Sequence, residues 1–266
     1  MVEVLKWDDS VTPARPAWVR TALICTDYDS AVRLRAVRRL SPLAPVSACS
    51  GLRPKDHALG VKSGRLIGLW HDRAVSDARV VAAEAVEARV RAFFEGHSVE
   101  VVVYDLGPER REVVPELRVL VVSPGPRSDS WAYITAGCWA AMEKDGDGLE
   151  FVMTAHVRDQ RFIDLMAMIA YYHCGGHQLD LEHSMPIGEP WVPGSACDHL
   201  LVSLPYHHGP DLEHCPLPGG HARILWALPV TAAEIEFRRH QGHEALEQLF
   251  DEAGIIPTDP FRASVV

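Results

Sequence analysis

Ile224-Leu-Trp-Ala-Leu-Pro-Val-Thr-Ala-Ala-Glu234 is the stretch of this sequence that says most about its fold. The apolar run from Ala222 to Val230 predicts a β-strand. Thr231 and Glu234 have the spacing of a capping box, in which each side chain bonds the backbone N–H of the other residue, so a helical region should follow directly and extend to Phe250. A strand that passes into a capped helix indicates a domain in which helices pack on a sheet.

Upstream of this stretch, short β-branched and apolar runs predict further strands. These are Val99 to Tyr104, Leu117 to Val122, Trp131 to Thr135, Leu149 to His156 and Asp198 to Ser203. Helical spacing predicts one helix that begins at a Ser76–Asp77 cap and runs up to Gly96, and another from Phe162 to Cys174. We therefore predict an α+β fold with a mixed or largely antiparallel sheet and packed helices.

The helix from Phe162 to Cys174 is apolar around nearly its whole circumference, so it should be buried. Two leucines of the late strand should join it in the core. The predicted core residues are Ile163, Leu165, Met166, Ile169, Ala170, Leu225 and Leu228.

Charge divides the chain into two parts. Residues 1–75 carry 12 Lys and Arg against 7 Asp and Glu, and one Arg-rich helix is expected from Tyr28 to Leu40. Residues 76–266 carry 14 Lys and Arg against 29 Asp and Glu, a net charge of −15. We expect a poorly ordered, basic N-terminal extension over 1–75 and one folded domain over 76–266. The acidic domain is a poor match for nucleic acid and a better one for a basic protein.

The compartment follows from what the sequence lacks. The sequence has no run of 18 or more apolar residues, the length that a helix needs to cross a bilayer. The first residues also lack the apolar core of a secretory signal. The six cysteines are scattered, with no C-x-x-C pair, which favours reduced thiols. We expect a cytoplasmic protein that has no membrane partner.

Histidine and cysteine density raises the possibility of a metal-dependent enzyme. Eleven of the 14 histidines lie at or after His156, with one group at His173, Cys174 and His177 and another across 207–221. The alternative is that His173 meets the carbonyl end of its helix and the later histidines lie on a surface loop. The usual spacing of zinc ligands is absent apart from His173 and His177. We expect no metal and no cofactor.

Motifs for nucleophilic or phosphate chemistry also fail on spacing. There is no G-x-S-x-G elbow and no complete phosphate-binding loop. Cys197 and His199 would face the same side of a strand, so a Cys–His pair is conceivable, but a buried Cys beside a half-exposed His is the more common arrangement. We expect a protein that is not an enzyme and has no catalytic residues.

Four stretches resemble the suppressor-of-fused family, over roughly residues 75–256. They are Trp131-Ala-Tyr-Ile-Thr-Ala-Gly137, Leu149-Glu-Phe-Val-Met-Thr-Ala155, the helix from Phe162 to Tyr172 with its continuation to Pro205, and the opening stretch above with its helix to Phe250. The resemblance implies an interaction domain. The animal members of the family restrain a transcription factor. For the bacterial members, the resemblance implies a role as immunity proteins against toxins. The shorter bacterial type is more similar to this sequence.

Two loop segments are the predicted partner-binding residues, because loops on a rigid scaffold often carry function. Trp191 stands between prolines in Glu189-Pro-Trp-Val-Pro-Gly194, and Trp in such a loop is a typical binding anchor. The alternative is that Trp191 packs on its own core. Tyr206, His207 and His208 form the second segment. We expect Trp191→Ala to weaken binding of a protein partner, such as a toxin, without unfolding the domain.

Overall fold

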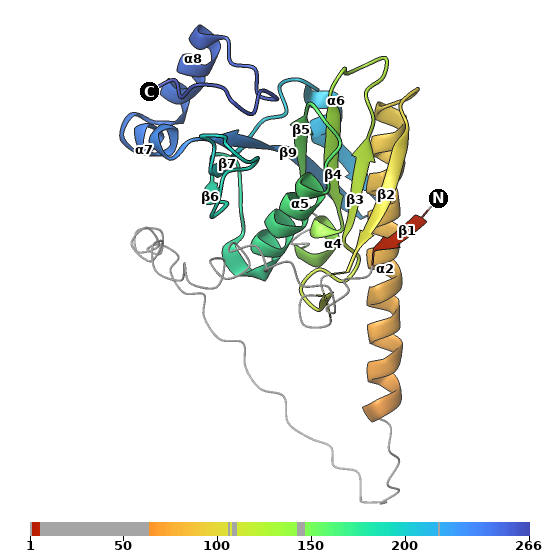
Figure 1. The fold of residues 1–266 in the computed structure, drawn as a ribbon. Helices are drawn as coiled ribbons and strands as arrows, with labels where there is room; N and C mark the ends of the chain where they lie inside the picture. Colours follow the sequence, from red (N-terminus) through yellow and green to blue (C-terminus); the bar gives the residue numbers. More distant parts are fainter. Residues whose placement is uncertain (1, 6–63, 106, 108–110, 143–146, 218) are drawn as a thin grey trace, which may run out of the picture.

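A nine-stranded mixed sheet forms the centre of the molecule (Figure 1). The computed structural model describes residues 2–5, 64–105, 107, 111–142, 147–217 and 219–266. The helix expected from Tyr28 to Leu40 lies outside these residues. The strand order is β1-β2-β3-β4-β5-β9-β7-β6, and β8 also pairs with β9. Only β1–β2 and β5–β9 are parallel pairs within the described residues, so the predicted α+β fold with a mixed, largely antiparallel sheet is confirmed.

Groups of strands are separated by helices along the chain, and two helices come last. The strands are β1 (Val2–Leu5), β2 (Val99–Tyr104), β3 (Arg118–Val122), β4 (Trp131–Ala136), β5 (Asp147–Ala155), β6 (Ser184–Pro186), β7 (His199–Ser203), β8 (His214–Leu217) and β9 (Gly220–Val230). The helices are α2 (Gly64–Phe93), α4 (Cys138–Met142), α5 (Gln160–Tyr172), which a π-helical turn η1 (His173–His177) extends, α6 (Pro210–Glu213), α7 (Ala232–Gln241) and α8 (His243–Ala253).

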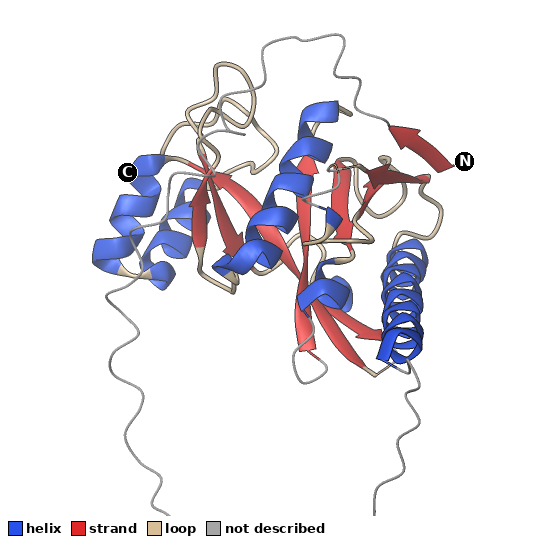
Figure 2. Cartoon of the chain, turned by 90° about the horizontal axis from the view of Figure 1, so that it is seen from below, coloured by secondary structure: helices blue, strands red, loops and turns tan. Residues whose placement is uncertain are grey.

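Helices cover both faces of the sheet (Figure 2). Alternate strand residues point to opposite faces, so Val119 and Val121 pack in one core with α5, whereas Leu120 and Val122 pack in a second core with α2. The second core continues beneath α7 and α8 at the other end of the sheet. All seven predicted core residues are buried.

The late strand and its capping box are as the sequence predicts. Thr231 Oγ1 accepts from the N–H of Glu234 at 3.2 Å, and Glu234 Oε2 accepts from the N–H of Thr231 at 2.8 Å. The helical region expected from Thr231 to Phe250 is present and consists of two helices, α7 and α8, which meet at Gly242. This residue has φ +96°, a conformation that a helix interior cannot contain and that glycine adopts readily.

The first long helix begins earlier than expected. The structure starts α2 at Gly64, so the helix runs through Ser76 and Asp77 and the predicted cap there is wrong. Good helix formers at Arg65, Leu66 and Leu69 favour the longer helix, and a Ser–Asp pair inside a helix costs little. Near the N-terminus, β1 pairs with the edge of β2. The division of the chain at residue 75 stays a prediction. Among the described residues, no helix is long and apolar enough to cross a membrane.

Candidate functional site

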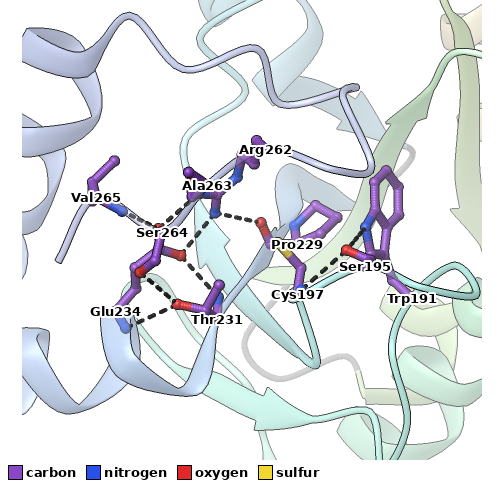
Figure 3. A network of polar contacts seen from close by, with 10 residues as sticks. All are labelled: Trp191, Ser195, Cys197, Pro229, Thr231, Glu234, Arg262, Ala263, Ser264 and Val265. Carbon is purple, nitrogen blue, oxygen red and sulfur yellow. Dashed lines mark hydrogen bonds and ion pairs between the residues drawn. The ribbon is translucent and has the colours of Figure 1, made fainter.

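A buried ion pair fixes the helices that carry the candidate site (Figure 3). Arg262 Nη1 and Nη2 donate to the two oxygens of Glu234 at 2.7 and 2.8 Å, and Nη2 also donates to the Pro229 carbonyl at 3.1 Å. The N–H of Val265 adds a bond to Glu234 Oε1 at 3.1 Å. Burial alone would raise the pKa of Glu234, but Arg262 and the Thr231 backbone outweigh it and hold the pKa below its usual value. The segment after α8 is thereby tied to the end of β9.

A surface cavity of about 380 Å³ lies between α8 and the second half of the sheet. Its apolar floor comes from strands β7 and β9, with Leu201, Trp226 and Leu228. One wall is the 204–209 loop after β7, and the opposite wall is α8 with the turn that follows it. The complete lining is Leu201, Ser203, Tyr206, His207, Trp226, Leu228, Glu247, Phe250, Asp251, Gly254, Ile255 and Pro257. We call it the α8 pocket.

Glu247 joins the two walls of the α8 pocket. Its Oε1 accepts from the Ser203 hydroxyl at 3.1 Å and from the Tyr206 hydroxyl at 2.9 Å. Nε2 of His243, one turn earlier on α8, lies 2.9 Å from the same oxygen. Burial and the hydrogen bond to Glu247 raise the pKa of Tyr206 to about 12, so the phenol keeps its proton and remains a donor.

The two adjacent histidines of the 204–209 loop have different surroundings. His207 lines the pocket and packs edge-on against Trp226, with ring centroids 4.9 Å apart. His208 packs against Phe94, the residue directly after α2, with ring centroids 5.3 Å apart. Burial lowers the pKa of His207 and lowers that of His208 to about 4, so neither ring contributes a positive charge at neutral pH.

Trp191 lies on the opposite face of the sheet from the α8 pocket, inside the α5 core. The side chain is 1% exposed, its ring centroid is 5.5 Å from that of Phe162, and its Nε1 donates to Ser195 Oγ at 3.0 Å (Figure 3). The guanidinium of Arg161 donates hydrogen bonds to the carbonyls of Pro190 and Trp191, both at 2.7 Å, and so holds the Trp191 loop against α5. The structure therefore brings Tyr206 and His207 together and leaves Trp191 apart from them. Trp191→Ala should destabilise the domain itself, by about 3–5 kcal/mol.

The Cys–His pair considered for catalysis consists of a buried Cys197 and a half-buried His199. Burial raises the pKa of the Cys197 thiol, which disfavours the thiolate that a nucleophile needs. Nδ1 of His199 lies 2.7 Å from Asp198, its neighbour in sequence. The buried Glu150 accepts from Thr135 Oγ1 at 2.6 Å and from the backbone N–H groups of Gly137 and Trp139 at the start of α4, which gives it a structural role.

The expected charge–dipole contact of His173 is wrong. The ring is buried, 5.2 Å from the ring of Phe151, and burial lowers its pKa to about 4, so it is uncharged at neutral pH. His177 instead stacks on Tyr172 at 3.8 Å. Within the described residues, no three or more His, Cys, Asp or Glu side chains gather in a way that could hold a metal ion.

Comparison with known proteins identifies the family. The model of the suppressor of fused protein (SUFU) family matches residues 114–263. The chain belongs to the suppressor of fused family. A crystal structure described as a SUFU homologue from Neisseria gonorrhoeae FA 1090 is 31% identical, with a TM-score of 0.60, and the match covers 70% of this chain and 97% of that one. No curated protein matches the sequence.

A more distant suppressor of fused structure shares the fold alone. It is described as the Sufu–Fu complex, is 13% identical, has a TM-score of 0.54, and the match covers 70% of this chain and 93% of that one. The family match begins at residue 114, within the segment between β2 and β3, and ends at Ala263, in the segment that Arg262 ties down. The α8 pocket therefore lies inside the part that is similar to other suppressor of fused proteins.

Sequence reasoning selected one wall of the α8 pocket and missed the other. Glu247 and Asp251 were not predicted, although they are four residues apart on a helix whose buried residues are Leu246 and Phe250. Acidic residues directly beside an apolar stripe, on the side that faces the sheet, were the available signal. Trp226 was predicted to lie in the late strand. The sequence does not say which face of the sheet its side chain points to, and this face decides whether the side chain lines the pocket.

Proposed function

We propose that this suppressor of fused domain works by binding a protein partner through the α8 pocket and the loop beside it, without catalysis. The observation that carries the proposal is the pocket itself, an aromatic and acidic hollow beside the exposed ring of Tyr206. Tyr206 is 57% exposed, and Ile256, between the lining residues Ile255 and Pro257, is 63% exposed. Exposed aromatic and apolar side chains around a hollow are typical of recognition surfaces. The Sufu–Fu complex supports a binding role for the fold.

In its more specific form, we propose that the protein is an immunity protein that neutralises a toxin in the cytoplasm. The net charge of −15 over residues 76–266 supports this. A toxin that acts on nucleic acid or an anionic membrane needs a basic surface, and an acidic domain attracts such a surface while it repels nucleic acid. Of the predicted contact residues, Tyr206, His207 and His208 stay in the proposal, and Trp191 supports the scaffold from inside the core.

The test is affinity capture from the native host with matched variants. The wild-type protein should recover one specific protein, and the Tyr206→Ala/His207→Ala double variant should lose it. His177→Ala, an exposed histidine beyond α5, is the control and should recover the partner as the wild type does. Equal recovery by all three proteins would place the contact elsewhere. Recovery of no protein, combined with turnover of a metabolite, would overturn the binding function.

The immunity form has its own measurement. Expression of a toxin-like protein from a neighbouring reading frame should arrest growth, and co-expression of the wild-type domain should restore it. The Tyr206→Ala/His207→Ala double variant should fail to restore growth at an equal level of soluble protein. Continued arrest in the presence of the wild-type domain would refute the immunity role and leave the binding role standing.

A further inference from the structure

The α8 pocket carries two acidic groups, of which Glu247 meets a histidine and Asp251 has no basic partner. Glu247 and Asp251 are one helical turn apart and both line the cavity. Among the described residues, the Asp251 carboxylate has no hydrogen bond or ion pair, and Glu247 meets only hydroxyl groups and His243. None of the lining residues is Lys or Arg. Two carboxylates that share a cavity with no Lys or Arg in its lining form a site for a positive charge.

Aromatic rings make up much of the remaining lining. Tyr206, His207, Trp226 and Phe250 surround the carboxylates. The negative faces of aromatic rings attract cations, and a planar guanidinium stacks on them while it forms paired hydrogen bonds with carboxylates. The same region already holds one such contact, because the guanidinium of Arg262 lies 5.4 Å from the centroid of the Phe250 ring. The charge of Arg262 is paired with Glu234, so Arg262 does not neutralise the pocket carboxylates.

A third feature suggests that the occupant also carries a hydrogen-bond acceptor. The indole Nε1 of Trp226 is buried and has no partner among the described residues. Such an unsatisfied donor costs free energy, which a ligand carbonyl oxygen would recover if the side chains that cover this N–H moved aside. A peptide supplies carbonyl groups at every residue.

We propose that the α8 pocket binds an arginine side chain of the partner protein, with Glu247 and Asp251 on the guanidinium and Tyr206 and Trp226 around its stem. The cavity of about 380 Å³ has room for one long side chain. Exposed Ile256, between the lining residues Ile255 and Pro257, offers an apolar contact to the flanking residues of the partner segment. The inference rests on the proposed binding function and names the chemistry that the site recognises.

The direct test uses a small probe and requires no knowledge of the partner. N-acetyl-arginine-amide is titrated into ¹⁵N-labelled protein, followed by its ¹H–¹⁵N spectrum. Saturable shifts should appear at the Trp226 indole and at residues 203–207 and 247–255. N-acetyl-citrulline-amide has nearly the same shape without the charge and should bind at least about tenfold more weakly, as expected when charge-assisted hydrogen bonds are lost. The lysine analogue of the probe, Nα-acetyl-lysine-amide, is titrated in the same way. Binding of the citrulline or lysine analogue as tight as that of the arginine probe, or the absence of saturable shifts, would overturn the assignment.

Carboxamide variants test which carboxylates of the pocket contribute to binding of the arginine probe. Asp251→Asn should weaken binding of the arginine probe about tenfold or more and leave the fold unchanged, because this carboxylate has no partner to lose. Glu247→Gln should have a similar effect on binding, and its dispersed spectrum would show whether the domain stays folded. Glu252→Gln, exposed on the same helix and bonded to Gln248, is the control and should bind as the wild type does. Unchanged binding in Asp251→Asn would refute the role of this carboxylate.

Failure of this inference is distinguishable from failure of the binding function. If Asp251→Asn captures the partner as well as the wild type does, while the Tyr206→Ala/His207→Ala variant does not, the arginine assignment falls and the binding function stands. If the arginine probe binds in the pocket but no protein is captured, the site chemistry stands and the proposed function falls.

Discussion

Replacing Arg262 with Met should strongly destabilise the domain. The change removes both hydrogen bonds of the bidentate pair with Glu234, at 2.7 and 2.8 Å, and the bond to the Pro229 carbonyl. Glu234 is 0% exposed, so its carboxylate would remain buried with only the N–H groups of Thr231 and Val265. Removal of one partner from a buried ion pair costs about 3–5 kcal/mol of unfolding free energy. Two charge-assisted hydrogen bonds at roughly 1.5–3 kcal/mol each give a similar figure.

Urea unfolding at pH 7, followed by circular dichroism, measures this loss as a lower midpoint with an unchanged slope. The Glu234→Gln/Arg262→Met double variant should be more stable than Arg262→Met alone, because a neutral amide costs less to bury and its oxygen still caps Thr231. Arg239→Met is the matched control. It breaks a pair with Glu236 in which both side chains are 57% exposed, and should change stability by less than about 0.5 kcal/mol. A loss below about 1 kcal/mol for Arg262→Met would refute the reasoning.

Three further predictions concern pH and the core. The pKa of Glu234 is lowered on folding, so its contribution is present above pH 4.5 and is lost as the pH falls through the folded-state pKa; Glu234→Gln should flatten this part of a urea-midpoint curve. His173 has a pKa lowered from 6.5 to about 4, so the unfolded chain takes up its proton first and the domain loses roughly 3 kcal/mol as the pH falls across that window; His173→Leu should lose less over the same range. Leu165→Ala should cost about 2–5 kcal/mol in urea unfolding, and a negligible cost would show that α5 is peripheral.

Local signals in the sequence were sufficient for the elements and for much of the core. Hydrophobic runs located β2 and β9, and the Thr231–Glu234 spacing located the start of α7, because both depend on residues close together in the chain. The break at Gly242 was missed, since a glycine between two helical patterns is compatible with one continuous helix until tertiary packing decides otherwise.

The candidate site was harder to predict because it is built across long distances in the chain. The prolines around Trp191 predict an extended loop equally well whether the ring points outward or inward, and the partner that buries it, Phe162, is 29 residues away. Similarly, Tyr206 and Glu247 are 41 residues apart and meet only because β7 and α8 lie side by side. The sequence could indicate which residues were suited to binding but not which ones shared a surface.

The position of β9 also has a consequence for the order in which the domain folds. This strand pairs with β5, β7 and β8, and Phe151 of β5 is aligned with Leu225, 74 residues later. Parallel pairing over such a separation carries a large loop-closure cost and is expected to form slowly. During synthesis, the edge of β5 that pairs with β9 stays without this partner until residues 220–230 emerge. The nascent chain should therefore be most prone to aggregation, and most dependent on chaperones, in the interval before β9 is made.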